Sequence, residues 1–516
     1  MKPINRDNKV KNFHQAKWDE PIIFELSKKG ERGIIPPKSE KEITNSVPGV
    51  SALPNNMLRK IPPALPEIAQ HRVLRHYLRL SQETLGADLN IEIGQGTCTV
   101  KYSPKINEAL ARLPEMSELH PLQDTSTVQG ILEIIYKTEE AMKEISGMDK
   151  FTFQPSGGSQ AIMTMASLVK AYHKKNNQDE QRNEIITTIY SHPSDAAAPA
   201  VKGYKIIKIL PDKDGYPDFE AFKNAVSNKT AAFIVANPED TGVFNSRIKE
   251  FTDLVHKNGG LCCYDQANAN GLLGVTRAKE AGFDMCFFNL HKTFSAPHGC
   301  GGPATGAVGV LNKLIGFLPA PLVDFKDGEY FLDYDIQNSI GKVRSYVGVP
   351  QVILKAYAFI MSLGADGLYE TAKVAVLNNN YMFNKLIKHK AIDAPYIEGK
   401  QRIEQVRYSL DKLFKDTGVS TEDIQRRMMD FGMHYWTSHH PYYIPNPVTL
   451  EPTETPSKDD IDEYISTLEN VIDEAYKNPS FLKNAPYSST IHKVDESNLD
   501  DPKNWSISWR SYKKNI

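Results

Sequence analysis

The chain has 516 residues, a formal net charge of -2 at pH 7, and 40% hydrophobic and 24% charged residues. This length allows two or three domains with a large core, and the near-neutral charge gives no reason to expect a nucleic-acid or membrane-surface partner. No apolar run approaches a membrane span in length, and Met1 to Val10 is polar and charged rather than signal-like.

The cysteines indicate a reducing compartment. There are five of them, Cys98, Cys262, Cys263, Cys286 and Cys300. Their number is odd and no two form a C-x-x-C pair, which argues against a disulfide framework and against a zinc site. We expect a cytoplasmic protein without a bound metal.

Residues 1–80 are predicted to form an N-terminal arm. They are rich in Pro, Lys and Glu with weak periodicity, as in Gly33 to Pro37 and Lys60 to Pro63. Such a segment is typical of short elements that lie over another surface, for example that of a partner subunit.

Residues 81–335 are predicted to form a large α/β domain. Helical periodicity over Val128–Ile145 precedes a loop at Gln154–Ser159 and a helix through His173. Further helical stretches are Phe219–Val226 and Arg247–Lys257, and the strand-like runs are Glu184–Tyr190, Tyr204–Leu210, Ala231–Ala236, Leu261–Tyr264, Met285–Phe288 and Ala307–Leu311. Short, nearly all-apolar strands that alternate with helices indicate a mostly parallel sheet covered on both faces. In such sheets, ligands bind beyond the carboxyl ends of the strands.

Residues 336–516 are predicted to form a smaller α+β domain with a C-terminal tail. Two helical stretches, Val352–Leu363 and Leu368–Lys388, are followed by a mixed segment. Ser420 and Ser457 each have an aspartate three residues on, which predicts capped helix starts. Gly432 is placed to end the first of these helices.

Lys292 is the most informative candidate residue. It follows the apolar run Met285–Phe288 and precedes a glycine-rich loop. A lysine held where a sheet ends can act as a carbonyl nucleophile, most often as the Schiff-base lysine of pyridoxal phosphate, PLP. Asp265 follows the preceding strand and could hold the pyridine nitrogen protonated, while Ala267 could lie against the cofactor. Alone, Asp265 would more often be a solvated or capping loop aspartate.

A candidate phosphate cradle lies upstream. Ser156, Gly157, Gly158, Ser159 and Gln160 precede a helix, and N–H groups at a helix start bind phosphate. His291 and Thr293 flank the lysine and could add donors. His192 follows the strand Glu184–Tyr190 and could stack on the cofactor or contact substrate. Taken singly, such a loop is usually a flexible turn and such histidines are often structural.

The motif Asn289-Leu290-His291-Lys292-Thr293-Phe294, with the Pro-His-Gly-x-Gly-Gly-Pro that follows, resembles the PLP-lysine motif of the glycine-cleavage P-protein family, in particular its separate subunit 2. The resemblance covers nearly the whole chain, and its other segments are Phe13 to Pro21, Cys98 to Tyr102, His120-Pro121, Val128 to Gly130, Ser339 to Arg344, Leu363 to Gly367 and Glu451 to Thr455. It implies a fold-type I, aspartate aminotransferase-like PLP enzyme with Lys292 as the Schiff-base lysine and Asp265 as the pyridine partner. It also implies decarboxylation of glycine, transfer of the aminomethyl group to the lipoyl H-protein, and an oligomer with a subunit 1.

Four segments depart from the family pattern. Ile93-Gly94-Gln95-Gly96-Thr97 replaces Tyr-Pro-Leu-Gly-Ser, and Ala161-Ile162 replaces Gly-Glu. Ser191 to Ala198 replaces Ala-His-Gly-Thr-Asn-Pro-Ala-Ser and keeps the histidine, and Ile403-Glu404-Gln405-Val406 replaces His-Glu-Phe-Val. If these segments line the rim, they could redirect the enzyme to another amino acid or another scissile bond. A diverged PLP-dependent lyase, decarboxylase or transferase is therefore one alternative, and a non-catalytic partner subunit with the same fold is a second.

Overall fold

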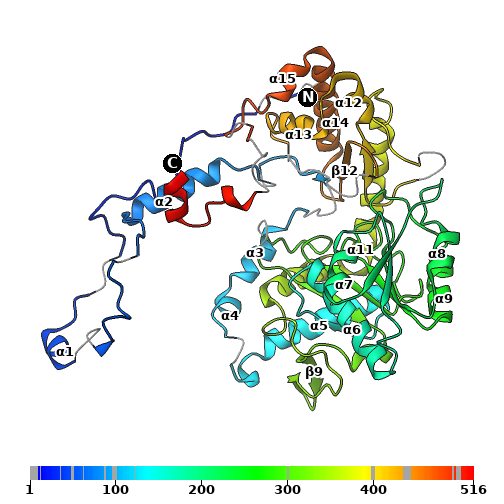
Figure 1. Cartoon of the computed structure of the whole chain (residues 1–516), viewed down its shortest axis with the longest axis horizontal. Coiled ribbons are helices and arrows are strands. Elements are labelled where there is room, and N and C mark those ends of the chain that lie inside the picture. Colours follow the sequence, from blue (N-terminus) through cyan, green and yellow to red (C-terminus); the bar gives the residue numbers. More distant parts are fainter. Residues whose placement is uncertain are drawn as a thin grey trace, which may run out of the picture.

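The computed structural model describes residues 10–11, 13–34, 37–47, 52–61, 63–86, 89–95, 101–120, 123–298, 302–396, 401–433, 443–490, 493–494 and 501–515. Figure 1 shows a large α/β body, a smaller group of helices and strands beside it, and an extended part formed by the two ends of the chain. Residues 98–100 of the predicted Cys98 segment and residues 299–301 of the glycine-rich loop lie outside the described residues, whereas Lys101 is buried and pairs with Glu454.

A seven-stranded sheet forms the centre of the large body, in the order β2-β8-β7-β6-β5-β3-β4. Its strands are β2 (Lys150–Thr152), β3 (Glu184–Thr188), β4 (Lys205–Ile209), β5 (Thr230–Ala236), β6 (Leu261–Asp265), β7 (Met285–Asn289) and β8 (Gly306–Val310). Strands β4, β3, β5, β6 and β7 pair in parallel, whereas β8 pairs antiparallel with both β7 and β2. The predicted mostly parallel sheet is confirmed.

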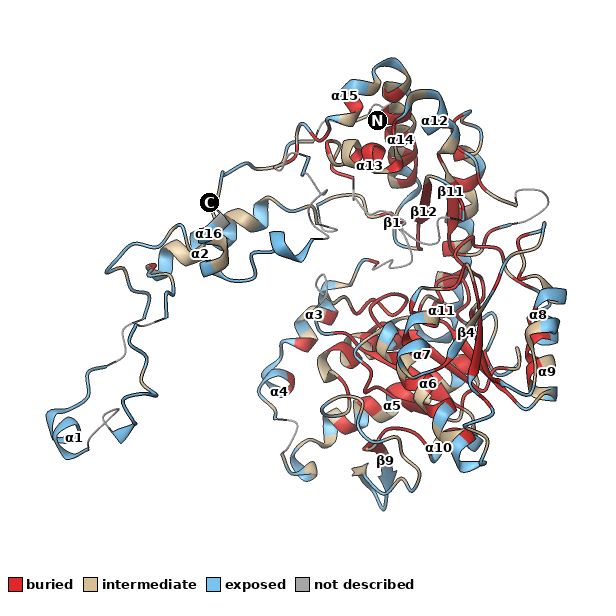
Figure 2. Cartoon of the chain, viewed as in Figure 1, coloured by how far each residue is buried: buried red, intermediate tan, exposed pale blue. Residues whose placement is uncertain are grey.

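Helices cover both faces of this sheet. The helices and short strands of the body are α3 (Lys105–Ala111), α4 (Pro114–Ser117), η2 (Thr125–Thr127), α5 (Gln129–Ser146), α6 (Gly158–Lys175), α7 (Ser194–Val201), α8 (Phe219–Ala225), α9 (Ile248–Lys257), α10 (Asn312–Ile315), β9 (Leu322–Lys326) and β10 (Glu329–Asp333). One hydrophobic core contains residues of α5, α8, α9 and α11, and the other contains residues of α6, α7 and α10. Figure 2 shows the resulting buried centre. Every residue of β3, β6, β7 and β8 is buried, which explains their nearly continuous apolar sequences.

The long helix α11 (Pro350–Leu386) connects the body to the smaller part. Its first half contributes Val352 and Ile353 to the large core, and its last turns contribute Met382 and Leu386 to the small one. Non-helical Gly364, with φ 63° and ψ -174°, interrupts it between the two helices predicted from the sequence.

Helix α11 is the one helix of the described residues that is long and apolar enough to cross a membrane by length and composition alone. The expectation that no apolar run approaches that length is therefore wrong for this segment. The helix lines both hydrophobic cores, and that role selects apolar residues as well.

The smaller part contains a three-stranded antiparallel sheet, in the order β1-β12-β11, packed with helices. Its elements are β1 (Gly94–Gln95), β11 (Val406–Ser409), α12 (Asp411–Thr417), α13 (Thr421–Met429), β12 (Pro447–Glu451), α14 (Lys458–Lys477) and α15 (Pro479–Lys483). Both predicted helix starts are confirmed, since Ser420 with Asp423 and Ser457 with Asp460 form complete capping boxes. Gly432, with φ 73°, lies in the turn after α13. Strand β1 pairs with β12, although residues 94–95 fall within the range predicted for the large domain.

Segments from the first ninety residues and from the last sixteen lie side by side in the extended part (Figure 1). It contains α1 (Lys41–Ser46), α2 (Gln70–Gln82), η3 (Pro502–Asn504) and α16 (Trp509–Asn515). The ring of Phe24 stacks on Trp509 with centroids 5.0 Å apart, and the buried pair His76–Glu20 fixes α2 against the first residues of the arm. Most of the remaining arm is exposed (Figure 2).

Candidate active site

Lys292 and Asp265 lie at the carboxyl ends of two neighbouring parallel strands. Asp265 is the last residue of β6, and Lys292 comes three residues after the end of β7. Both are buried, with 7% and 4% of their surface exposed. The residues between β6 and β7 form turns rather than the helix of a βα unit. The two candidate residues nevertheless share one edge of the sheet, as predicted.

The carboxylate of Asp265 is held by the turn that follows it. Its Oδ1 atom accepts a hydrogen bond of 2.8 Å from the backbone N–H of Ala267. Ala267 is itself buried. The backbone therefore fixes Oδ1, and with it the orientation of the second carboxylate oxygen, Oδ2.

The loop from Ser156 to Gln160 leads into α6, whose first residue is Gly158. Ser159 and Gln160 are thus helical rather than part of the predicted loop. The Gln160 side chain accepts hydrogen bonds of 2.7 Å from both the backbone N–H and the hydroxyl of Ser156, and its amide donates to Val343 O at 2.7 Å. Gln160 therefore acts as a brace for this loop.

Two glycines let the loop lie close to its neighbours. Gly157 has φ 151°, and a Cβ on Gly158 would lie 2.9 Å from Asn289 Nδ2. Since the first N–H groups of a helix have no partner within it, the start of α6 offers donors beside the end of β7. An anionic group suits this position.

His291 and Thr293 flank the lysine as expected, but in different roles. Burial, and then the neighbouring Lys292 and His298 side chains, lower the pKa of His291 to about 3, so its ring is neutral. Its Nδ1 is buried and has no hydrogen-bond partner among the described residues. The Thr293 hydroxyl accepts a hydrogen bond of 2.9 Å from Ala269 N–H, which ties the lysine segment to the turn after β6.

His192 lies in the turn after β3, on the rim where it was predicted. Its Nδ1 is 2.6 Å from the Ser194 hydroxyl and 3.1 Å from the Ser194 backbone nitrogen. These contacts place the ring at the start of α7. Among the described residues, no aromatic ring or cation stacks on the imidazole of His192, so the predicted stacking role stays a prediction.

Two buried acids near Lys292, Asp195 and Glu404, were not predicted as site residues. Asp195 in α7 is in contact with Asp265, and Glu404, just before β11, faces Glu451 and Lys292. Burial first, and then Glu451, raises the pKa of Glu404 well above its usual value. The sequence signal was weak, because an aspartate in the first turn of a helix and a glutamate before a strand are ordinary surface positions.

The four divergent segments do not all line a rim. Ala161 and Ile162 are fully buried in the core under α6, and Ile93 is fully buried in the small core. The interpretation of these three as rim residues is wrong, because their side chains pack into apolar clusters. Residues 96–97 lie outside the described residues. Among the described residues of these segments, Asp195 and Glu404 lie near Lys292, and Glu404 is a position at which the chain keeps the family residue.

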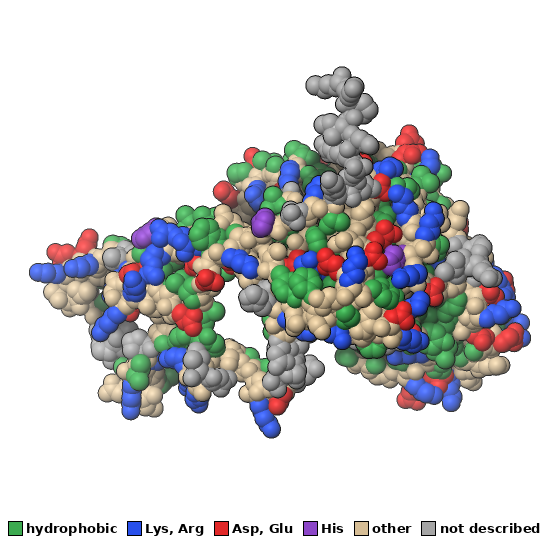
Figure 3. Space-filling model, turned by 90° about the horizontal axis from the view of Figure 1, so that it is seen from above, with side chains coloured by type: hydrophobic (Ala, Val, Ile, Leu, Met, Phe, Trp, Pro, Cys, Tyr) green, Lys and Arg blue, Asp and Glu red, His purple; other side chains and the backbone are tan. Residues whose placement is uncertain are grey.

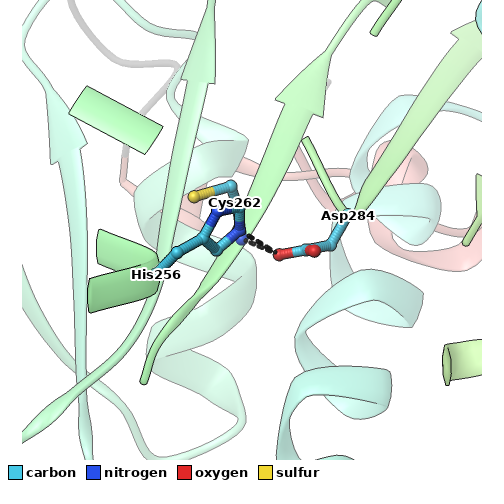
Figure 4. A group of neighbouring side chains, drawn as sticks. All are labelled: His256, Cys262 and Asp284. Atoms are coloured by element: carbon cyan, nitrogen blue, oxygen red, sulfur yellow. Dashed lines mark hydrogen bonds and ion pairs between the residues drawn. The ribbon is translucent and has the colours of Figure 1, made fainter. Parts of the chain in front are cut away.

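A second polar cluster lies at the opposite edge of the sheet (Figure 4). His256 Nε2 and the backbone N–H of Cys262 both lie within hydrogen-bonding distance of Asp284 Oδ2, at 2.9 and 2.8 Å. Lys313 Nζ occupies the other oxygen at 2.6 Å. Burial raises the pKa of Cys262 well above its usual value, so its thiol stays protonated. The Asp284 carboxylate is already paired with the Lys313 ammonium group, and the Cys262 thiol keeps its proton. The three side chains His256, Cys262 and Asp284 therefore do not suit a metal ion.

Comparison with known proteins identifies the family. Residues 123–307 match the aminotransferase class-V family, and residues 371–487 match the C-terminal domain of glycine dehydrogenase. The chain is 42% identical over 504 residues to a probable glycine dehydrogenase (decarboxylating) subunit 2 of Pyrococcus abyssi, covering 97% of this chain and 98% of that protein. It is 41% identical to the protein of the same name from Caldanaerobacter subterraneus subsp. tengcongensis, covering 92% and 96%.

The fold agrees with these matches. A crystal structure of glycine decarboxylase (P-protein) of the glycine cleavage system, in inhibitor-bound form, superposes with a TM-score of 0.69 at 19% identity and covers 82% of this chain and 94% of that one. A NifS-like protein superposes with a TM-score of 0.55 at 15% identity, covering 73% and 97%. The fold is the aminotransferase-like architecture expected from the sequence, and the chain belongs to the glycine dehydrogenase (decarboxylating) subunit 2 family.

Proposed function

We propose that this protein is a PLP-dependent enzyme that decarboxylates glycine and passes the remaining aminomethyl group to the lipoyl arm of an H-protein. The observation that carries the proposal is the pairing of Lys292 with Asp265. The two side chains lie buried at the carboxyl ends of adjacent parallel strands, Asp265 as the last residue of β6 and Lys292 just after β7, where ligands bind in this architecture. Family membership supports the same reaction.

The residues at this edge fit PLP. Lys292 would hold the cofactor covalently, and Asp265 would contact its ring nitrogen. Ser156, Gly157 and Gly158, with the N–H groups of Ser159 and Gln160, would form the phosphate site at the start of α6. The unpartnered Nδ1 of His291 and the Thr293 hydroxyl add polar groups beside the lysine, while Ala267 and His192 lie on the rim. When bound, PLP supplies an electron sink for the electron pair released at the α-carbon of the amino acid.

The surrounding residues control charge and water in this site. Glu404 is buried, and burial together with the neighbouring Glu451 raises the pKa of its carboxyl well above the usual value, which favours the protonated, hydrogen-bond-donating form. Glu451 orients the turn after β6 through Asn268 and Asn270. Burial of Lys292 and Asp265 keeps water away from the reacting groups, which strengthens every electrostatic contact there.

We also propose a complex with a second subunit, because the names of the relatives imply one. The exposed apolar side chains Leu74, Tyr77 and Leu78 of α2 are spaced as one helix face and support this proposal. On the face drawn in Figure 3, basic and acidic side chains are interspersed, and neither sign of charge forms a large patch there. Apolar contact, rather than attraction between oppositely charged surfaces, is therefore the interaction that we propose for the partner. Localisation in the cytoplasm is part of the same proposal, and the free buried thiols of Cys262, Cys263 and Cys286 suit a reducing compartment.

The cofactor is tested with purified protein and PLP. A visible absorbance band that appears with PLP and is lost in Lys292→Ala supports Lys292 as the attachment site. Lys223→Ala is the matched control, since Lys223 lies on the exposed surface of α8. Absence of the band in the wild-type protein would leave the non-catalytic subunit as the better description.

The reaction is tested by exchange of labelled bicarbonate into glycine, with subunit 1 and lipoylated H-protein present. Exchange that requires both partners supports glycine decarboxylation. A PLP-loaded protein that shows no exchange, but turns over another amino acid, would instead support the diverged enzyme. Asp195, which stands where the family loop has asparagine, favours testing that alternative with a panel of amino acids.

A further inference from the structure

Asp195 is a fully buried carboxyl group next to Asp265. It lies in the first turn of α7 with none of its surface exposed. Its neighbour is the Asp265 side chain, close enough for a hydrogen bond between the two carboxyl groups once one of them carries a proton. Neither oxygen of Asp195 meets an N–H or O–H donor among the described residues.

Such a contact requires a proton. Two ionised carboxylates only accept hydrogen bonds, so a contact between them is repulsive, and burying a charge without a donor is costly. When one of the pair is protonated, its O–H donates to the other and the repulsion disappears. Asp265 Oδ1 already accepts from Ala267 N–H, which leaves the other side of that carboxylate for Asp195.

The charged groups around Asp195 favour the same state. Burial, then Asp265, and to a smaller degree Glu239, raise the pKa of Asp195 well above its usual value. Lys292 alone among the named groups acts in the opposite direction. Glu239 follows β5, Asp265 ends β6 and Lys292 follows β7, so three neighbouring strands present these charges to α7.

We propose that Asp195 is a neutral carboxylic acid that donates its O–H to Asp265, so that the two carboxyl groups hold one shared proton and one negative charge. Asp195 is a positioning residue, because it acts through Asp265. An amide at this place would also donate, but its donor would not depend on pH. The aspartate makes the support of Asp265 dependent on protonation.

Its consequence for the cofactor rests on the proposed function. Two donors, the Asp195 hydroxyl and Ala267 N–H, fix the plane of the Asp265 carboxylate. The pair then presents a single negative charge to the ring nitrogen of PLP. Removing the Asp195 donor releases one side of Asp265 and weakens cofactor binding.

The protonation state is tested first in the protein without PLP. Infrared difference spectra at pH 8 compare the wild type with Asp195→Asn. We expect a protonated-carboxyl C=O band in the wild type that is missing from the variant and that shifts in heavy water. Glu239 and Glu404 contribute to both spectra and cancel. Identical spectra for the two proteins would overturn the proposal.

Cofactor binding is the second readout. Asp195→Asn keeps a donor and is expected to bind PLP nearly as well as the wild type. Asp195→Leu has a similar size and no donor, and is expected to lose affinity about ten- to hundredfold, the effect of one hydrogen bond to a charged group. Equal affinity for the leucine variant, folded as judged by circular dichroism, would contradict the positioning role.

The two proposals fail in different ways. If the infrared band is present but PLP does not bind, Asp195 still carries its proton and the proposed function is wrong. If PLP binds to Lys292 without the band, the proposed function stands and the shared proton is refuted.

Discussion

Asn268 and Glu451 join the two parts of the molecule. The side-chain amide of Asn268, in the turn after β6, donates to both carboxylate oxygens of Glu451 at 2.8 Å each. Asn270 adds a third hydrogen bond at 2.7 Å. Glu451 ends β12 of the small sheet and is fully buried. The small sheet thus holds the turn that begins with Asp265, which makes the active site dependent on how the two parts pack.

Glu451→Ala is expected to destabilise the protein. The change leaves the amides of Asn268 and Asn270 without their acceptor, and a buried unsatisfied polar group costs about 1–3 kcal/mol. We expect a lower midpoint of urea unfolding and weaker PLP binding, with Glu451→Gln intermediate because it keeps one acceptor. Glu329→Ala, on the exposed edge of β10, is the control. An unchanged midpoint for Glu451→Ala would show that the turn is held by other contacts.

Gly158→Ala is expected to weaken cofactor binding. Its new Cβ would lie 2.9 Å from Asn289 Nδ2, so the start of α6 or the Asn289 side chain has to move. Both border the proposed phosphate site, and we expect a higher dissociation constant for PLP in a fluorescence titration. Gly130→Ala is the matched control, since Gly130 lies in α5 with nothing within 4 Å of its Cβ position. In a helix that change stabilises by about 0.5–1 kcal/mol. Similar losses of PLP affinity in the two variants would argue against the cradle.

The strands of the large sheet could be predicted because they are buried on both faces. Runs such as Leu261–Asp265 contain almost only apolar residues and end in a polar one, so both the strand and its functional end are visible. Strand β2 was missed, because three residues between two helices carry no periodicity. The antiparallel direction of β8 relative to β7 and β2 was also not predicted, since the direction of a strand depends on the path of the segments that connect it.

In the candidate site, too, the residues marked by local sequence could be predicted, and those brought together by distant parts of the chain could not. Lys292 and Asp265 were predictable because each follows an apolar strand, and parallel strands bring their ends to one edge. Asp195 was not, because its contact with Asp265 joins residues seventy positions apart and its sequence surroundings are those of a helix start. The error at Ala161 and Ile162 has a similar origin. Their positions in the first turns of α6 suggested the rim, but the helix turns these side chains into the core.

Glu139 makes the stability of the fold depend on pH. Burial raises its pKa to about 7, against the opposing effects of Lys150, 3.3 Å away, and the Phe151 N–H. Below about pH 4.5 the carboxyl is protonated in the folded and unfolded states alike, so its full contribution is present. As pH rises towards 7, only the folded protein keeps the proton, and that contribution is lost.

The expected size of this effect is about 3 kcal/mol between pH 4.5 and pH 8, from the shift of the Glu139 pKa to about 7. Glu139→Gln cannot titrate, so its apparent melting temperature relative to wild type should rise over this range. Glu140→Gln, at the next residue of α5, is the control because its side chain is 45% exposed, whereas that of Glu139 is buried. A constant difference between wild type and Glu139→Gln at all pH values would rule out this titration.

Leu74→Glu in α2 is expected to prevent assembly with the second subunit while leaving the cofactor site intact. Leu74, Tyr77 and Leu78 lie on one face of α2 and are 62%, 55% and 55% exposed. A charge at the centre of an apolar contact is costly to bury, so size-exclusion chromatography of the mixed subunits should show the separate proteins. The PLP absorbance band should persist, because α2 lies in the extended part, apart from the large body that contains the cofactor site (Figure 1). Val275→Glu makes a similar change at an exposed apolar residue of the body and should not affect assembly. If Leu74→Glu assembles as well as the wild type, this face of α2 is not the contact, and the partner binds elsewhere on the molecule.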